Sequence, residues 1–124
     1  MDRARSLVAA VLVLGACADD KDDRPAEWPY IAAAIIQPNC ASASCHSNLT
    51  RTGGLVLEEA NSSCVTLRGY EPDGNFVVPG NPTESKLVAL LRGDETWRMP
   101  PDLPLPEADI QLIEKWILLG AECK

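Results

Sequence analysis

The only histidine of this chain, His46, directly follows a cysteine, and this pairing restricts the fold more than any other feature. Four residues separate Cys40 from Cys45, so two thiols and one imidazole lie within a stretch of seven residues. A cysteine pair that ends in Cys-His is typical of covalently attached haem, in which both sulfurs add to the vinyl groups and the histidine binds the iron. The usual motif has two residues between the cysteines. Residues 41–44 are small enough to bulge outward, and such a bulge would let both sulfurs reach one macrocycle.

The first sixteen residues have the layout of a secretory signal. Arg3 and Arg5 precede an apolar run at residues 7–14, which is too short to span a bilayer. The run ends in Leu-Gly-Ala-Cys, which resembles a bacterial lipobox, so we expect acylation of Cys17 and attachment to the membrane through that anchor. The alternative is an ordinary signal peptide. The residue after the lipid cysteine is Ala18, and an Asp at this position would favour the inner membrane. We therefore expect a periplasm-facing lipoprotein of the bacterial cell envelope, on the outer membrane.

Cleavage before Cys17 leaves 124 − 16 = 108 residues, which is enough for one compact domain. Residues 17–27 are charged and interrupted by proline, so we expect an acylated flexible tether, followed by a single domain at residues 28–124. Without the signal, 17 acidic and nine basic side chains remain, a net charge of 9 − 17 = −8. This acidity argues against nucleic acid as a partner and suits a partner protein with a basic patch.

The first half of the domain predicts helices and no convincing sheet. A first helix is expected at residues 29–37, where Pro38 would end it. A weakly patterned stretch allows at most a short helix at residues 58–67. Only residues 76–78, Phe-Val-Val, look strand-like. The predicted class is therefore mostly α.

The second half has clearer helix signals. Residues 81–84, Asn-Pro-Thr-Glu, form a capping pattern for a helix that runs to about residue 92 and stops at Gly93. Apolar residues recur with helical spacing from residue 106 to residue 119, and Gly120 is placed as a C-terminal stop.

Cys64 and Cys123 remain once Cys17 is assigned to lipid and the other two cysteines to haem. An even remainder in an oxidising compartment is consistent with a disulfide between them. Two alternatives stay open. Both cysteines can be free thiols, or Cys40 and Cys45 can also form a bridge in a different pairing arrangement.

The segment at residues 97–106 contains the second chemical signal. Four prolines within seven residues make it a stiff, extended loop, and Met99 immediately precedes the first of them. A thioether is a soft ligand that suits haem iron, and a His/Met ligand pair raises the reduction potential. The alternative is that Met99 only fills the core, as most methionines do. The neighbouring Arg98 is a donor that can bind haem propionates or pair with nearby carboxylates.

Five blocks, in this order, resemble a class I cytochrome c domain and are similar to the planctomycete-type cytochrome c domains of bacterial lipoproteins. The blocks are residues 40–46, 53–57, 77–87, 98–101 and 116–121. The resemblance implies a small fold of three to four helices around one haem c, attached at Cys40 and Cys45. It also implies His46 and Met99 as the iron ligands, and first and last helices that pack against each other. The departures are the four-residue gap, two further cysteines, and Ser47 where the family usually has glycine.

Three functions compete on these observations. The first is a monohaem c-type cytochrome, which is an electron carrier and not an enzyme, with a redox partner that the sequence does not identify. The second is a haem-free domain of the same fold, held by Cys40–Cys45 and Cys64–Cys123 disulfides, that serves as a structural or interaction module. The third is a zinc site built from three cysteines and His46, which an oxidising compartment disfavours.

Overall fold

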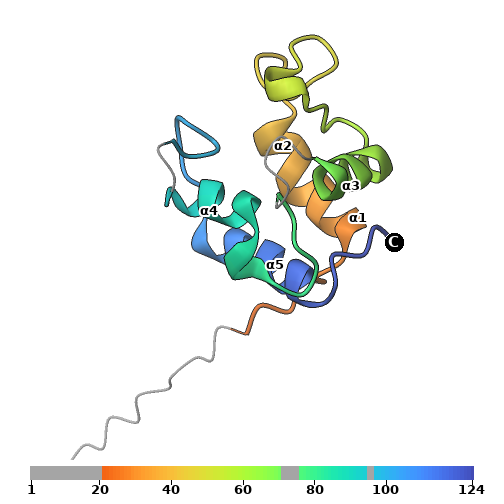
Figure 1. The fold of residues 1–124 in the computed structure, drawn as a ribbon, viewed down its shortest axis with the longest axis vertical. Coiled ribbons are helices and arrows are strands. Elements are labelled where there is room, and N and C mark those ends of the chain that lie inside the picture. Colours follow the sequence, from red (N-terminus) through yellow and green to blue (C-terminus); the bar gives the residue numbers. More distant parts are fainter. Residues whose placement is uncertain (1–20, 71–75, 95–96) are drawn as a thin grey trace, which may run out of the picture.

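The structure is a computed structural model that describes residues 21–70, 76–94 and 97–124 (Figure 1). The predicted signal sequence, Cys17 and the start of the tether lie outside the described residues. Within those ranges the chain is helical and has no strand, and residues 76–78 are irregular, which confirms the mostly α class. No helix in the described ranges combines the length and the apolar character needed to cross a membrane.

The first helix is longer than predicted because it passes through Pro38. It consists of α1 (Trp28–Ile31), a π-helical turn η1 (Ala32–Ile36) and α2 (Gln37–Cys40) without a break. The prediction that Pro38 ends the helix was wrong. A proline has no N–H to donate to the carbonyl four residues earlier, which normally ends a helix. Here the helix reaches Pro38 through a π-helical bond, in which the N–H of Gln37 donates to the carbonyl of Ala32, five residues back. The Asn39 side chain also donates to the carbonyl of Ile35 at 2.7 Å, and these contacts carry the helix past the proline to Cys40.

Three more helices and two short 3₁₀ turns complete the described elements. They are η2 (Thr52–Gly54), α3 (Ala60–Gly69), η3 (Pro82–Glu84), α4 (Lys86–Arg92) and α5 (Glu107–Leu118). The short helix predicted at residues 58–67 and the last helix predicted at 106–119 are confirmed as α3 and α5, with ends displaced by one or two residues. Gly93 ends α4 with a φ of +77°, and Gly120 follows α5 with a φ of +109°.

The helix predicted from residue 81 begins later than expected. The Asn81 side chain accepts a hydrogen bond from the Glu84 N–H at 3.3 Å, but only the turn η3 follows it. Ser85 is extended, with φ −82° and ψ 115°, and this break separates η3 from α4. The buried Ser85 hydroxyl accepts from the Val78 N–H and donates to the Asn81 carbonyl, both at 2.9 Å. These two bonds explain why the chain leaves the helical conformation at this residue.

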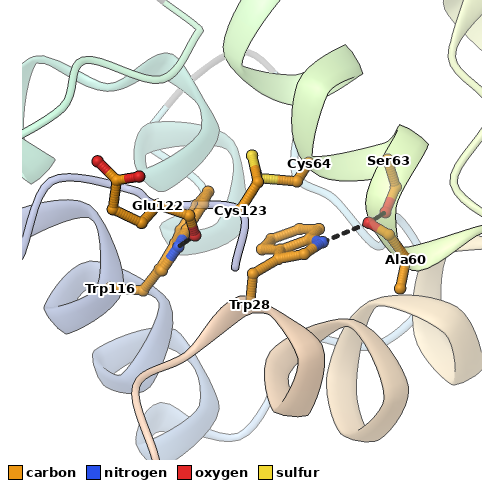
Figure 2. The surroundings of a disulfide bond; sticks show 7 residues. All are labelled: Trp28, Ala60, Ser63, Cys64, Trp116, Glu122 and Cys123. Carbon is orange, nitrogen blue, oxygen red and sulfur yellow. Dashed lines mark hydrogen bonds between the residues drawn. A yellow bond between two sulfur atoms is a disulfide. The ribbon is translucent and has the colours of Figure 1, made fainter.

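Two tryptophans join the first and last helices, as the resemblance implied. Trp28 of α1 and Trp116 of α5 are 0% and 2% exposed, and their ring centroids are 4.7 Å apart. The Trp28 indole donates to the carbonyl of Ala60 at the start of α3, at 2.5 Å. The Trp116 indole donates to the carbonyl of Glu122 at 2.8 Å (Figure 2). Both buried N–H groups are therefore satisfied, and each ties a further segment to the helix pair.

Beside this tryptophan pair, Cys64 of α3 and Cys123 are joined by a disulfide (Figure 2). Their Cα atoms are 5.6 Å apart, which is an ordinary separation for such a bridge. Among the pairings left open by the sequence, this one is formed, while Cys40 and Cys45 are free thiols. The bridge holds the C-terminal residues against α3.

Candidate cofactor site

Four of the five predicted cofactor-binding residues meet at one cavity of about 630 Å³. Cys40, Cys45, His46 and Met99 all line it, although they come from two regions more than fifty residues apart. The rest of its wall is largely apolar and comes from the end of η1, the 52–57 segment, the end of α3, residue 76 and α4. These apolar residues include Ile36, Leu55, Leu57, Leu67, Phe76, Leu87, Leu90 and Leu91. This volume lies within the range of small-molecule and cofactor sites, roughly 300–1,000 Å³.

The loop between the two cysteines bulges outward in part, since Ala41 packs against the core and Ser44 lines the cavity. Its base is closed by a hydrogen bond from the His46 N–H to the Cys40 carbonyl at 3.0 Å. A second bond, from the Cys45 N–H to the Ser42 carbonyl at 2.9 Å, shapes its end. Residues 42–44 are exposed. The longer loop is therefore accommodated with its middle residues exposed, and both cysteines still line the cavity.

The two thiols differ in their electrostatic surroundings. Burial raises the pKa of Cys40 to about 11, and the nearby Cys45 adds to that rise. Hydrogen bonds from the side chains of Ser42 and Ser44 lower the pKa of Cys45, and the Ser44 oxygen lies 3.7 Å from its sulfur. Cys45 is therefore the more readily ionised of the pair.

The backbone on both sides of His46 is held in place by hydrogen bonds. The His46 carbonyl accepts from the Leu57 N–H at 2.8 Å, and the Cys45 carbonyl accepts from the Thr52 N–H at 3.1 Å. Ser47, where the resembled family usually has glycine, is 3% exposed, and its hydroxyl accepts from the N–H groups of Leu49 and Thr50 at 3.2 and 3.3 Å. Ser47 thus caps the turn that follows the motif, and the substitution fits the local fold.

The imidazole of His46 has a ring nitrogen, Nδ1, that is buried and has no hydrogen-bond partner among the described residues. A buried polar atom without a partner costs free energy, so a ligand that contacts this nitrogen would remove that cost.

Met99 is held against α4, the helix that precedes it in the sequence. Its N–H donates to the carbonyl of Leu90 at 3.0 Å, which ties the proline-rich loop to that helix. Arg98 is not among the cavity-lining residues. Its side chain packs against Gly93, and its Nε is buried without a hydrogen-bond partner among the described residues. The structure therefore brings four of the five predicted residues to the cavity and places Arg98 next to it.

Sequence reasoning missed the polar residues that complete the cavity wall. The Tyr70 hydroxyl donates to the carbonyl of Gly53 at 2.6 Å, and both residues line the cavity. Gly53 has a φ of +63°, and a Cβ added there would lie 3.4 Å from the Tyr70 oxygen. The glycine signal indicated a turn or a close approach, and the structure contains both. Asn39, Thr52 and Lys86 also line the cavity and had no recognisable motif.

These residues fit a haem. A mostly apolar cavity, two free thiols, one imidazole with an unpartnered nitrogen and one thioether form the donor set that covalent His/Met-ligated haem requires. A zinc site fits less well, because the disulfide takes up two of the thiols that a three-cysteine site needs. The described residues contain no cluster of three or more His, Cys, Asp or Glu side chains that could hold a metal ion.

Residues 43–102 match the family described as planctomycete cytochrome C. The chain is similar to planctomycete-type cytochrome c domains. The matched stretch contains Cys45, His46 and Met99 and begins three residues after Cys40. With the usual two-residue spacing, the first thiol of a planctomycete-type domain would fall at position 42, which is serine here. No curated protein and no solved structure matches the chain.

Proposed function

We propose that this chain is a monohaem c-type cytochrome that carries electrons in the bacterial cell envelope. The observation that carries the proposal is that Cys40, Cys45, His46 and Met99 line the same apolar cavity. The similarity of residues 43–102 to planctomycete cytochromes supports it as well. We expect an electron carrier and not an enzyme, since the chain itself would supply two ligands to the iron, His46 and Met99.

In this proposal each residue has a distinct role. Cys40 and Cys45 hold the haem through thioether bonds, and His46 and Met99 are the ligands of its iron. When bound, the haem supplies a one-electron ferric/ferrous couple. The leucines of α4 and of the 52–57 segment exclude water, and the thioether of Met99 favours the reduced state relative to a second nitrogen ligand. Arg98 lies beside the cavity and does not line it, and a propionate that reached it would give its unpartnered Nε an acceptor.

The location is part of the proposal. Cleavage of the signal before Cys17 and acylation of that cysteine would anchor the domain to the outer membrane, facing the periplasm. Residues 17–27 would link the lipid to the domain.

The test is an absorption spectrum and an intact mass of the mature chain, co-expressed with a c-type haem maturation system. We expect a sharp reduced α-band and the added mass of one haem, retained in denaturing acid and organic solvent. Cys40→Ser and Cys45→Ser should each lose a thioether bond. Met99→Ala should keep the added mass but change the spectrum, because it removes an iron ligand and neither thiol.

A matched variant tests the effect of the motif spacing on haem attachment while the cavity stays the same. Cys40→Ser combined with Ser42→Cys restores two residues between the cysteines. A colourless wild-type chain with the bare polypeptide mass would refute the proposal, whatever this variant does. Haem in the variant alone would show that the cavity fits and that the natural spacing prevents attachment. Haem in neither would favour the haem-free module held by disulfides.

A further inference from the structure

Among the described residues, the cofactor cavity is lined by one lysine, by no arginine and by no Asp or Glu. The lysine is Lys86, the first residue of α4. The whole chain has 18 Asp and Glu against 11 Lys and Arg, so the cavity wall has the opposite charge balance. In a mostly apolar pocket, the few polar or charged groups are those that orient the ligand. The cavity therefore suits a ligand with an apolar body and an anionic group.

Lys86 lies at the start of the apolar face that α4 presents to the cavity. Leu90, four residues later, also lines the cavity, and residues at this spacing share one face of a helix, about 6 Å apart along its axis. The backbone here is held in place, because the Leu87 N–H donates to the Phe76 carbonyl at 3.0 Å and the Ser85 hydroxyl makes two hydrogen bonds. The Lys86 side chain is half-buried, so its stem covers apolar surface beside the leucines.

The position of α4 fits the distribution of charge on a haem. The vinyl groups that react with cysteines lie on two pyrrole rings, and the two propionates lie on the opposite edge of the macrocycle. Cys40 is the last residue of α2, and Cys45 follows it in the next loop. A site that holds the vinyl edge there needs its partner for the propionates on a different wall. Figure 1 shows α4 apart from α2, and both helices line the cavity.

Lys86 is better placed for a propionate than Arg98. The Arg98 side chain packs against Gly93 and does not line the cavity. The Tyr70 hydroxyl and the Asn39 amide, two neutral donors of the wall, already donate to backbone carbonyls at 2.6 and 2.7 Å. The ammonium of Lys86 loses water when the cavity is filled, and a charge that loses water needs an opposite charge beside it.

We propose that Lys86 is a positioning residue that binds a haem propionate. This inference rests on the proposed haem function. A hydrogen bond between an ammonium and a carboxylate is charge-assisted, and such a bond changes affinity by roughly tenfold or more. By holding the propionate edge at α4, Lys86 directs the vinyl edge toward Cys40 and Cys45, which is the orientation that attachment requires.

The test compares the binding of ferric haem with that of its dimethyl ester, in which both propionates are blocked. Both are titrated at pH 7 into the chain with Cys40 and Cys45 replaced by serine, so that binding is reversible, and binding is followed by haem absorption. We expect haem to bind at least about tenfold more tightly than the diester. Lys86→Met and Lys86→Gln should both abolish this difference and leave the diester affinity unchanged, which also shows that the variants fold. Lys86→Arg should keep most of the difference.

Two control variants separate this contact from a general effect of charge. Lys115→Met removes the same charge from an exposed position of α5 outside the cavity wall and should leave the ratio of the two affinities unchanged. Arg98→Met tests the neighbouring arginine. Equal affinities in the parent chain, an unchanged ratio in Lys86→Met, or a ratio lost only in Arg98→Met would each overturn the inference. If neither porphyrin bound to any of these chains, the proposed haem function itself would fail.

Discussion

Removal of the Cys64–Cys123 disulfide should destabilise the domain strongly, mainly through the unfolded chain. The two cysteines are 59 residues apart in sequence. Closing a loop of that length lowers the entropy of the unfolded chain by about 14 cal/mol/K, which corresponds to about 4 kcal/mol at 25 °C. For a domain of this size, that loss lowers the melting temperature by roughly 15–30 °C. The cofactor cavity should form with or without the disulfide, because neither cysteine of the bridge lines it.

The assay is urea unfolding followed by tryptophan emission, with Cys17, Cys40 and Cys45 replaced by serine so that only one pair remains. Alanine is the better replacement for Cys64, which is completely buried, because a serine would bury a hydroxyl as well. Cys64→Ala, Cys123→Ala and the double variant should lose nearly the same free energy of unfolding, since each breaks the same bond. A loss below about 1 kcal/mol in the double variant would refute the loop-entropy reasoning.

Two further predictions concern ionisable groups. In the haem-free chain at pH 8, iodoacetamide should alkylate Cys45 at least about tenfold faster than Cys40, because their pKa values are shifted in opposite directions; equal rates by peptide mass mapping would contradict this. The Arg92 guanidinium lies 2.6 Å from Glu114 and 3.1 Å from Glu107, and it lowers the pKa of Glu107. The pair with Glu107 therefore stabilises the folded state above the ordinary Glu pKa, and this stabilisation is lost as the pH falls through the lowered pKa. Arg92→Met should therefore lower the melting temperature more at pH 7 than in strong acid, below the lowered pKa of Glu107, and an equal effect in both conditions would contradict the ion pair.

The helices that sequence reasoning placed correctly are those whose signals are local. Gly93 and Gly120 adopt the positive φ that a helix stop requires, and the apolar spacing of α5 matches its buried face. Pro38 misled the prediction because the bonds that carry the helix past it depend on a π-helical turn that precedes the proline. Ser85 misled it because its helix-breaking bonds reach back to Val78 and Asn81.

The site could be predicted only in part, for a related reason. A cysteine pair beside a histidine is recognisable at short range, whereas the cavity wall combines segments from residue 36 to residue 101. Nothing in the residues around Tyr70 or Lys86 indicates that they line it. The Cys64–Cys123 pairing likewise needed the fold, since sequence alone leaves several connectivities open.

The π-helical turn at Ala32–Ile36 also sets the direction in which the end of the first helix faces. A π-helical turn holds one residue more than an α-helical turn, and each residue of an α-helix advances the chain by about 100° around the axis. If the turn relaxed to a regular helix with every residue kept, Cys40 would rotate by about a quarter of the way round the axis, whereas deletion of a single exposed alanine, Ala33 or Ala34, together with that relaxation would restore its present direction. One residue of helical register thus decides whether both thiols face the same space.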